Sequence, residues 1–128
     1  MKFDVIIGNP PYQGTAGTQT GQTIWDKIVQ VSIDHVKDGG LMTFIHPGRW
    51  RQPDDKLRQL YTQYQLVYLS IHTVKEGVKT FKACTPYDVY MIRKTAPDRC
   101  ARIRFSDGVE GEYRAQRWPF IPKSMINF

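Results

Sequence analysis

The chain contains 128 residues, 41% hydrophobic and 23% charged, and its 18 Lys and Arg against 12 Asp and Glu give a net charge of +6. This composition excludes general disorder, and the length suffices for one domain with its own core. No apolar stretch approaches the roughly 20 residues that a membrane-spanning helix needs, and the N-terminus does not have the pattern of a signal peptide. We therefore expect a cytoplasmic protein with no membrane partner, in which Cys84 and Cys100 are reduced thiols.

The positive charge is concentrated in the second half of the chain. Residues 1–64 hold seven Lys or Arg and six Asp, a net charge of +1, whereas residues 65–128 hold eleven Lys or Arg and six Asp or Glu, a net charge of +5. A basic region of this kind favours an anionic partner, of which nucleic acid is the usual example. A solvated basic surface accounts for the same counts, so charge alone does not choose between them.

The first predicted element is a short buried strand over residues 3–7, which stops at Gly8. Residues 9–12, Asn-Pro-Pro-Tyr, cannot continue it, because two prolines remove two backbone donors and fix two φ angles. Residues 14–23 contain only Gly, Thr, Gln and Ala, which is typical of a loop.

A helix is predicted next, with Thr23 as its N-cap, Asp26 reaching back to that cap, and Gly39-Gly40 as its end. Its apolar stripe is expected to face the core. The stripe comprises Ile24, Ile28, Val31 and His35, flanked by Trp25 and Val36.

The rest of the chain continues the alternation of strands and helices. A second strand is predicted over residues 41–45, and a second helix begins at Pro53, Asp54 and Asp55 because proline and carboxylates suit a first helical turn. The apolar stripe of that helix comprises Leu57, Leu60, Tyr61 and Tyr64. Further strands are predicted over residues 66–71 and 88–92, with a weak strand over 102–105 and a turn at Asp107-Gly108. The order predicts an open α/β sheet, parallel at first and ending in an antiparallel hairpin.

The most informative residues are Asn9, Pro10, Pro11 and Tyr12, which follow a predicted buried strand at the end where open α/β sheets bind ligands. The Asn9 side-chain oxygen and the Pro10 carbonyl are two acceptors for the two N–H donors of an exocyclic amine on a planar base, and Pro11 has no N–H to occupy that carbonyl. The Tyr12 ring offers a stacking surface worth on the order of 1–3 kcal/mol. Held in this way, the amine keeps its lone pair directed at an incoming electrophile. Taken as a bare string, the tetrapeptide fits a tight turn equally well.

With the residues that follow it, this segment resembles the S-adenosylmethionine-dependent amino-methyltransferases, above all the N6-adenine DNA methyltransferases. Asn-Pro-Pro-Tyr after a buried strand is similar to their catalytic motif, and residues 25–41 resemble the helix-to-strand segment that follows it. Residues 44–50, Phe-Ile-His-Pro-Gly-Arg-Trp, resemble the corresponding strand and loop of methyltransferases in type II restriction–modification systems. Residues 79–90 resemble the stretch that places a second aromatic ring against the extruded base, which implies that role for Phe81.

The resemblance covers about residues 2–94 and implies a partial Rossmann-like methyltransferase sheet of parallel strands with a terminal antiparallel hairpin. It implies that residues 1–94 form the catalytic-motif half of a methyltransferase domain, with residues 95–128 starting a target-recognition or linker region. S-adenosylmethionine is the implied cofactor, but no strand and Gly-rich loop precede residue 3, so the cofactor-binding half is missing and its residues stay unknown. The strand at residues 3–7 would then lie at an unprotected edge, and we expect a second polypeptide or a copy of the chain to cover it.

Other candidates for DNA contacts follow strand ends or lie in a Lys-rich loop. Arg49, Trp50 and Arg51 could hold phosphate and stack a base, although a Trp packed on the core explains that segment as well. A second basic group could follow a DNA backbone, and it comprises Lys75, Lys79 and Lys82. No metal site is expected, because His35, His46 and His72 do not have metal-ligand spacing.

These expectations combine into one functional hypothesis, methyl transfer to the N6 amine of adenine in DNA, inactive without the missing half. Two alternatives stay open: a non-catalytic fragment that binds DNA or a partner, and a protein-glutamine methyltransferase, which has the same tetrapeptide. The basic second half and residues 44–50 argue against the last of these.

Overall fold

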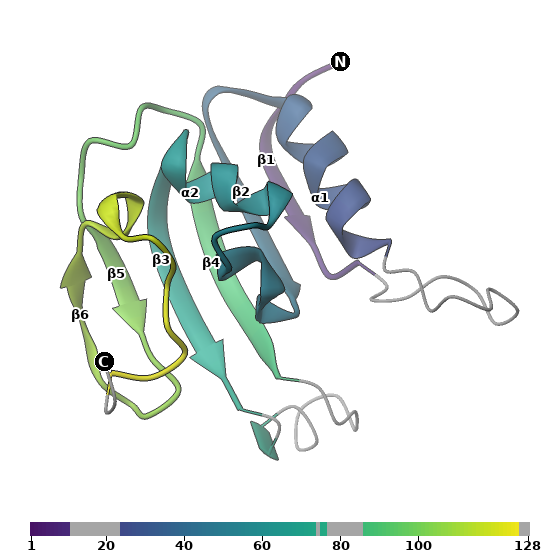
Figure 1. The fold of residues 1–128 in the computed structure, drawn as a ribbon. Helices are drawn as coiled ribbons and strands as arrows, with labels where there is room; N and C mark the ends of the chain where they lie inside the picture. The colour runs from purple at the N-terminus through teal and green to yellow at the C-terminus, as the bar shows by residue number, and fades with distance from the viewer. Residues whose placement is uncertain (11–23, 74, 77–85, 126–128) are drawn as a thin grey trace, which may run out of the picture.

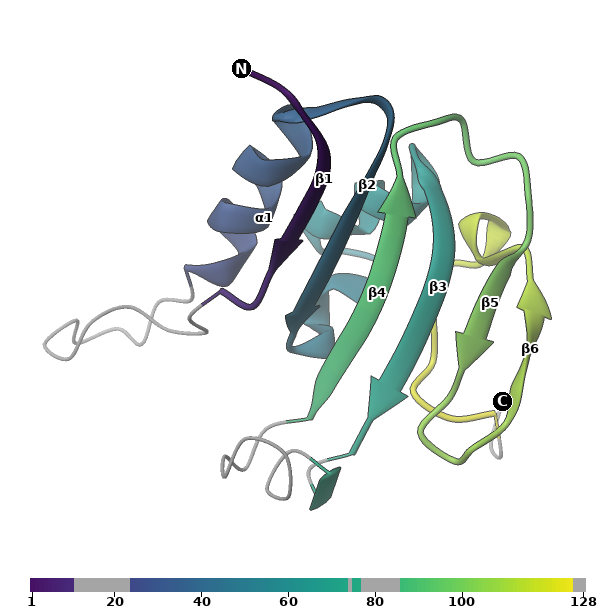
Figure 2. The same cartoon turned by 180° about the vertical axis from the view of Figure 1, so that it is seen from behind.

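The structure, a computed structural model, describes residues 1–10, 24–73, 75–76 and 86–125, which form a six-stranded sheet with its helices on one face (Figure 1). The strands are β1 (Phe3–Gly8), β2 (Val36–His46), β3 (Gln65–His72), β4 (Tyr87–Arg93), β5 (Ala101–Arg104) and β6 (Glu110–Tyr113). The helices are α1 (Trp25–Asp34) and α2 (Gln59–Thr62), with short 3-10 helices at Gly48–Arg51, Lys56–Arg58 and Ala115–Arg117. Seen from behind, the strands lie in front and the helices behind them (Figure 2).

The strands follow the order β1-β2-β4-β3-β5-β6 across the sheet. β1 is parallel to β2 and β3 is parallel to β5, whereas β4 is antiparallel to both β2 and β3. The prediction of an α/β sheet with parallel strands and an antiparallel hairpin is therefore confirmed in part. The sheet ends in an antiparallel hairpin, formed by β5 and β6. The antiparallel pair β3 and β4 is internal, because β4 returns between β2 and β3. Chain order alone does not show that the connection from β2 to β3 leaves room for one strand between them.

The first helix differs from its prediction at both ends and in the face that it buries. Its N-cap residue is Ile24, without a side-chain cap, and Asp26 instead accepts a hydrogen bond from the backbone N–H of Lys27 at 2.9 Å; Thr23 lies outside the described residues. The helix ends at Asp34, well before Gly39. Its buried side chains are Trp25, Val29 and Ile33, and the stripe expected to face the core points outward, with Ile28 36% and Val31 58% exposed.

The segment expected to end α1 belongs to β2. Val36 is fully buried, and the register between β1 and β2 jumps from Phe3↔Val36 to Val5↔Leu41, so residues 37–40 form a bulge. Gly39 has the left-handed conformation expected of it, with φ +81°, but inside this bulge and not at a helix end. Pairing with β1 and β4 outweighs the helical tendency of residues 35–38.

The second predicted helix is broken into short pieces. Pro53 and Asp54 lie in a turn, and Asp55 caps a 3-10 turn by accepting a hydrogen bond from the Leu57 N–H at 2.9 Å. α2 itself spans only four residues, although Leu57, Leu60 and Tyr61 are buried as their spacing predicts. The spacing of the apolar residues therefore predicted which side chains are buried, but it did not predict that the helix is interrupted.

The later strands match their predictions, and the end of the described chain joins the same core. β5 pairs with β3, and Ile103, Phe105 and Ile121 are at most 1% exposed. Gly108 forms the predicted turn with φ +86°, and β6 follows it. The segments before and after residue 94 thus share one sheet, and a role in target recognition for the later segment stays a prediction. No helix among the described residues is long and apolar enough to cross a membrane, and Cys100 is a free, exposed cysteine.

Candidate active site

The carboxyl ends of β1, β2 and β3 and the amino end of β4 lie together, because the first three strands run in one direction and β4 runs in the other. They form the edge of the sheet that consists of strand ends, which differs from the lateral edge along β1. Asn9 follows β1 at this edge with an exposed side chain, and Pro10 is buried. Gly8 allows β1 to approach β2 closely here, since a Cβ at residue 8 would collide with the Phe44 ring. The edge therefore presents the Asn9 amide to solvent next to a fixed backbone.

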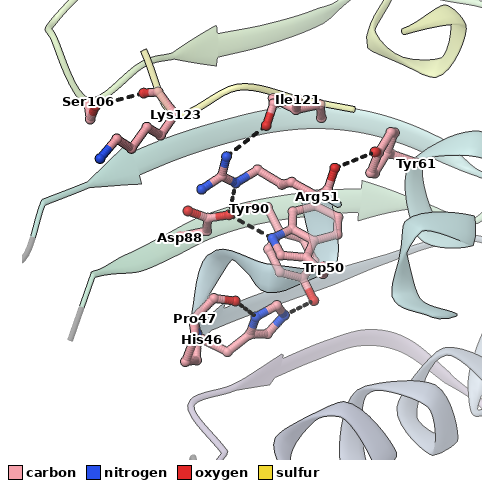
Figure 3. A network of polar contacts seen from close by, with 10 residues as sticks. All are labelled: His46, Pro47, Trp50, Arg51, Tyr61, Asp88, Tyr90, Ser106, Ile121 and Lys123. Carbon is pink, nitrogen blue, oxygen red and sulfur yellow. Dashed lines mark hydrogen bonds and ion pairs between the residues drawn. The ribbon is translucent and has the colours of Figure 1, made fainter. Parts of the chain in front are cut away.

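A network of buried polar side chains joins the ends of β2 and β4 at the same edge (Figure 3). The carboxylate of Asp88, 1% exposed, accepts hydrogen bonds from Trp50 Nε1 and Arg51 Nε, each at 2.7 Å, through the same oxygen. Arg51 also donates through Nη1 to the Ile121 carbonyl at 2.8 Å. Burial raises the pKa of Asp88, and the Arg51 guanidinium and the Trp50 indole oppose that rise. The Asp88 carboxylate thus links β4 to the turn after β2, and Arg51 links that turn to the segment around Ile121.

His46, the last residue of β2, extends the network toward α1. Its Nδ1 lies 2.9 Å from the Pro47 carbonyl, which can only accept, so Nδ1 carries the proton and Nε2 accepts a hydrogen bond from the Tyr90 hydroxyl at 2.7 Å. The ring stacks on Trp25 with centroids 4.3 Å apart. Burial lowers the pKa of His46 to about 4, so the ring is neutral at neutral pH.

A pocket of about 360 Å³ opens beside this network, between the ends of β2 and β3. Its walls include Arg49, Arg51, His72, Asp88 and Lys123, together with apolar atoms of residues such as Ile71. The His72 ring stacks on Tyr87 at 4.5 Å and bonds to the Glu76 carboxylate at 2.7 Å, which lowers the pKa of Glu76. A second hollow of about 500 Å³ lies at the opposite end of β3 and β4, away from Asn9.

The structure separates the predicted site residues into three groups. Asn9, Pro10, Arg49 and Lys75 are described, and all but Pro10 are exposed. Trp50 is fully buried and Arg51 is 8% exposed, so the Trp50 ring is packed on the core and is not available to stack on a base. A third group lies outside the described residues: Pro11, Tyr12, Lys79, Phe81 and Lys82.

The family model of the Eco57I restriction-modification methylases matches residues 1–79, more than half of the chain. The chain belongs to this family. Its fold is similar to three solved structures at 17–18% sequence identity, all from type I systems. One comes from work on the complex assembly and conformational transition of a type I restriction–modification system. Its TM-score is 0.62, and the match covers 84% of this chain and 26% of that chain.

The other two structures are modification subunits. One is the modification subunit of a putative type I restriction enzyme from Vibrio vulnificus YJ016, with a TM-score of 0.59, 80% of this chain covered and 25% of that chain. The other is the EcoKI M protein, with a TM-score of 0.60 and coverages of 80% and 25%. The chain therefore spans about a quarter of the length of these structures. No curated protein matches its sequence.

The sequence patterns did not reveal the residues that hold this edge together. The sequence pattern predicts Asp88 only as the start of a strand, and it gives His46 no role. The sequence does contain a signal for such a network. Asp88 begins the apolar segment 88–92, and a carboxylate that is buried with such a segment needs a cation or a hydrogen-bond donor beside it. Arg51 and Trp50 supply that pairing from 37 and 38 residues away, a distance along the chain that only the fold closes.

Proposed function

We propose that the chain provides the catalytic-motif half of an enzyme that transfers a methyl group from S-adenosylmethionine to the N6 amine of adenine in DNA. The observation that carries this proposal is the position of Asn9, which is exposed directly after β1 at the edge where the ends of β2 and β3 also lie. Membership of the restriction-modification methylase family supports it.

In this proposal the chain's own groups hold and orient the amine. The Asn9 side-chain oxygen and the Pro10 carbonyl accept its two N–H groups, which leaves the nitrogen lone pair free for the methyl group. Tyr12 and Phe81 stack on the two faces of an adenine extruded from the duplex.

The described residues do not by themselves form a site for S-adenosylmethionine. β1 is an edge strand, and no described strand followed by a Gly-rich loop lies beside it. The cofactor-binding half must therefore come from another polypeptide segment, and the chain alone should neither bind the cofactor tightly nor transfer a methyl group.

DNA is the proposed partner of the same edge. Arg49 is exposed, and its ion pairs within the described part of the chain are long, at 3.9 Å with Asp54 and 3.6 Å with Asp55, so its guanidinium can turn to a phosphate. Lys75 is exposed in the loop region between β3 and β4, and we assign Lys79 and Lys82 the same role. Arg51 contributes indirectly, through its ion pair with Asp88.

The test is radiolabelled methyl transfer to a duplex, with the cofactor-binding half of a restriction–modification methylase supplied in trans. Asn9→Ala should lower transfer at least 10²-fold, the typical cost of removing one oriented group at a developing charge. Gln63→Ala, which removes an exposed amide far from the edge, is the matched control and should leave transfer unchanged. Full activity of Asn9→Ala would remove the assigned role.

A non-catalytic fragment that binds DNA or a partner is the second candidate, favoured by the edge position of β1 and the lack of a cofactor cradle among the described residues. It predicts no transfer under any complementation, with DNA affinity that falls steeply as salt rises. Transfer that depends on Asn9 would exclude it.

A further inference from the structure

The pocket of about 360 Å³ beside the polar network has no role in the proposed reaction. The turn after β2, the end of β3, the start of β4, Ser106 and Lys123 form its walls. Asn9 and Pro10, which hold the amine in the proposed function, are not among the described residues that line it. Its volume lies in the range of small-molecule sites, about 300–1,000 Å³. The pocket is therefore a separate candidate binding site.

Two buried side chains present polar atoms to this pocket. Asp88 is 1% exposed and Arg51 is 8% exposed, and both line it. Asp88 accepts its two hydrogen bonds through Oδ2, and Arg51 donates through Nε and Nη1. Within the described part of the chain, Asp88 Oδ1 and Arg51 Nη2 have no hydrogen-bond partner, yet the fully enclosed side-chain atom without one is Trp25 Nε1. Oδ1 and Nη2 are therefore not sealed in the core, and they open on the pocket.

These two atoms lie side by side against Gly48. A Cβ at residue 48 would collide with Arg51 Nη2 and would lie 3.1 Å from Asp88 Oδ1. The pocket thus offers an N–H donor next to a carboxylate acceptor. A lone anion would meet the carboxylate and a lone cation the guanidinium, so the pair fits a neutral group that has an acceptor beside a donor. The edge of a nucleobase has this arrangement, as in N7 and the N6 amine of adenine.

The other walls fit the rest of a nucleotide. Lys123 is exposed, and its ammonium has no ion pair within the described residues. The Lys123 carbonyl accepts hydrogen bonds from Ser106 N and Oγ at 2.8 and 2.7 Å, which fixes the backbone and leaves the ammonium for a phosphate (Figure 3). The apolar residues of the pocket, which suit the flat faces of a base, are Pro47, Ile71 and Pro86.

We propose that this pocket binds a nucleotide, with the base edge on Arg51 Nη2 and Asp88 Oδ1 and the phosphate on Lys123. The inference goes beyond the proposed function, because it uses neither Asn9 nor S-adenosylmethionine. Two sources offer the same chemistry, a free nucleoside monophosphate and a nucleotide within a DNA strand, and the test separates them.

The Trp50 indole N–H signal in proton–nitrogen NMR spectra reports on the pocket, because Trp50 Nε1 donates to the Asp88 carboxylate at 2.7 Å. The chain is titrated with ribose 5-phosphate, with inorganic phosphate, and with the 5′-monophosphates of adenosine, guanosine, cytidine and thymidine. At least one nucleotide should shift this signal and bind about tenfold more tightly than ribose 5-phosphate, which lacks a base edge.

Lys123→Ala tests the phosphate contact and keeps the backbone bonds to Ser106, which use the Lys123 carbonyl. It should weaken nucleotide binding about tenfold, because a charge-assisted hydrogen bond is lost. Lys56→Ala is the matched control, since Lys56 is exposed and does not line the pocket, and it should leave the affinity unchanged.

A short single-stranded DNA oligonucleotide separates the two sources. If it shifts the Trp50 signal at lower concentration than every mononucleotide, the ligand is a nucleotide of a DNA strand, and the reverse order identifies a free nucleotide. An unmoved Trp50 signal, equal binding of ribose 5-phosphate or inorganic phosphate, or equal affinities of Lys123→Ala and Lys56→Ala would each overturn the proposal. Since the readout involves no methyl transfer, such a failure would leave the role of Asn9 unaffected.

Discussion

The polar network at the ends of β2 and β4 differs from the margin surface in how completely the chain covers and pairs its side chains. By the margin surface we mean the outer edge of β1 with Phe3, Val5 and Ile7, and the outward side of α1 around Val31. In the network, Asp88, Arg51 and His46 are buried and each has at least two hydrogen bonds or a hydrogen bond and a stacked ring. The margin surface instead leaves large apolar side chains in water. Among the described residues, the buried side-chain donor without a partner is Trp25 Nε1, and it belongs to α1.

This difference indicates where the chain is self-sufficient. The network joins β2, β4 and the segment around Ile121 by contacts far apart in sequence, so it stabilises the chain on its own. The margin surface contributes little to the isolated chain, because side chains exposed in the folded state gain nothing by folding. We therefore expect substitutions in the network to lower the free energy of unfolding of the isolated chain. Substitutions in the margin surface should leave it nearly unchanged.

The largest expected effect is that of Asp88→Ala. Removing the carboxylate leaves the Arg51 charge buried without its ion pair, which should lower the free energy of unfolding by about 3–5 kcal/mol in urea titrations. Asp4→Ala is the control, because Asp4 is 84% exposed and pairs with Lys37 at 3.5 Å, a pair worth at most about 1 kcal/mol. Equal losses in both variants would contradict the central role of the network.

A slightly smaller effect is expected from the protonation of His46. Its pKa is about 4 in the folded chain and 6.5 when unfolded, so below pH 6.5 the unfolded state binds a proton that the folded state does not. Stability from this group is complete above pH 6.5 and falls until about pH 4, by about 3 kcal/mol in total. Urea titrations across this pH range should show a shallower slope in His46→Gln, and identical slopes would refute the prediction.

The smallest expected effect is at the margin surface. Val31→Ala should change the free energy of unfolding of the isolated chain by less than about 0.5 kcal/mol. Ile33→Ala, two residues away on the buried stripe of the same helix, should lower it by about 2–5 kcal/mol, because Ile33 is 4% exposed. Thermal or urea unfolding of the two variants checks this contrast. If they prove equally destabilising, α1 is not oriented as described.

Much of the strand pattern could be predicted from the sequence because short apolar runs and turn residues are local signals. β3, β4 and β5 lie within a residue of their predicted bounds, and Gly108 forms its turn. The Asn-Pro-Pro-Tyr segment, for which we propose the catalytic role, was also visible locally, and the family match over residues 1–79 agrees with that resemblance. Helix α1 was harder, because it carries two apolar stripes and its sequence does not say which one meets the sheet.

The sequence by itself determined the alternation of strands and helices, the Asn-Pro-Pro-Tyr segment after the first strand, and the family. Tertiary structure decided the position of β4 between β2 and β3, the stripe of α1 that is buried, and the pairing of Asp88 with Trp50 and Arg51. The physical reason is the range of the forces involved. Backbone propensity and proline geometry act over a few residues, whereas burial and ion pairing depend on which segments the fold brings together.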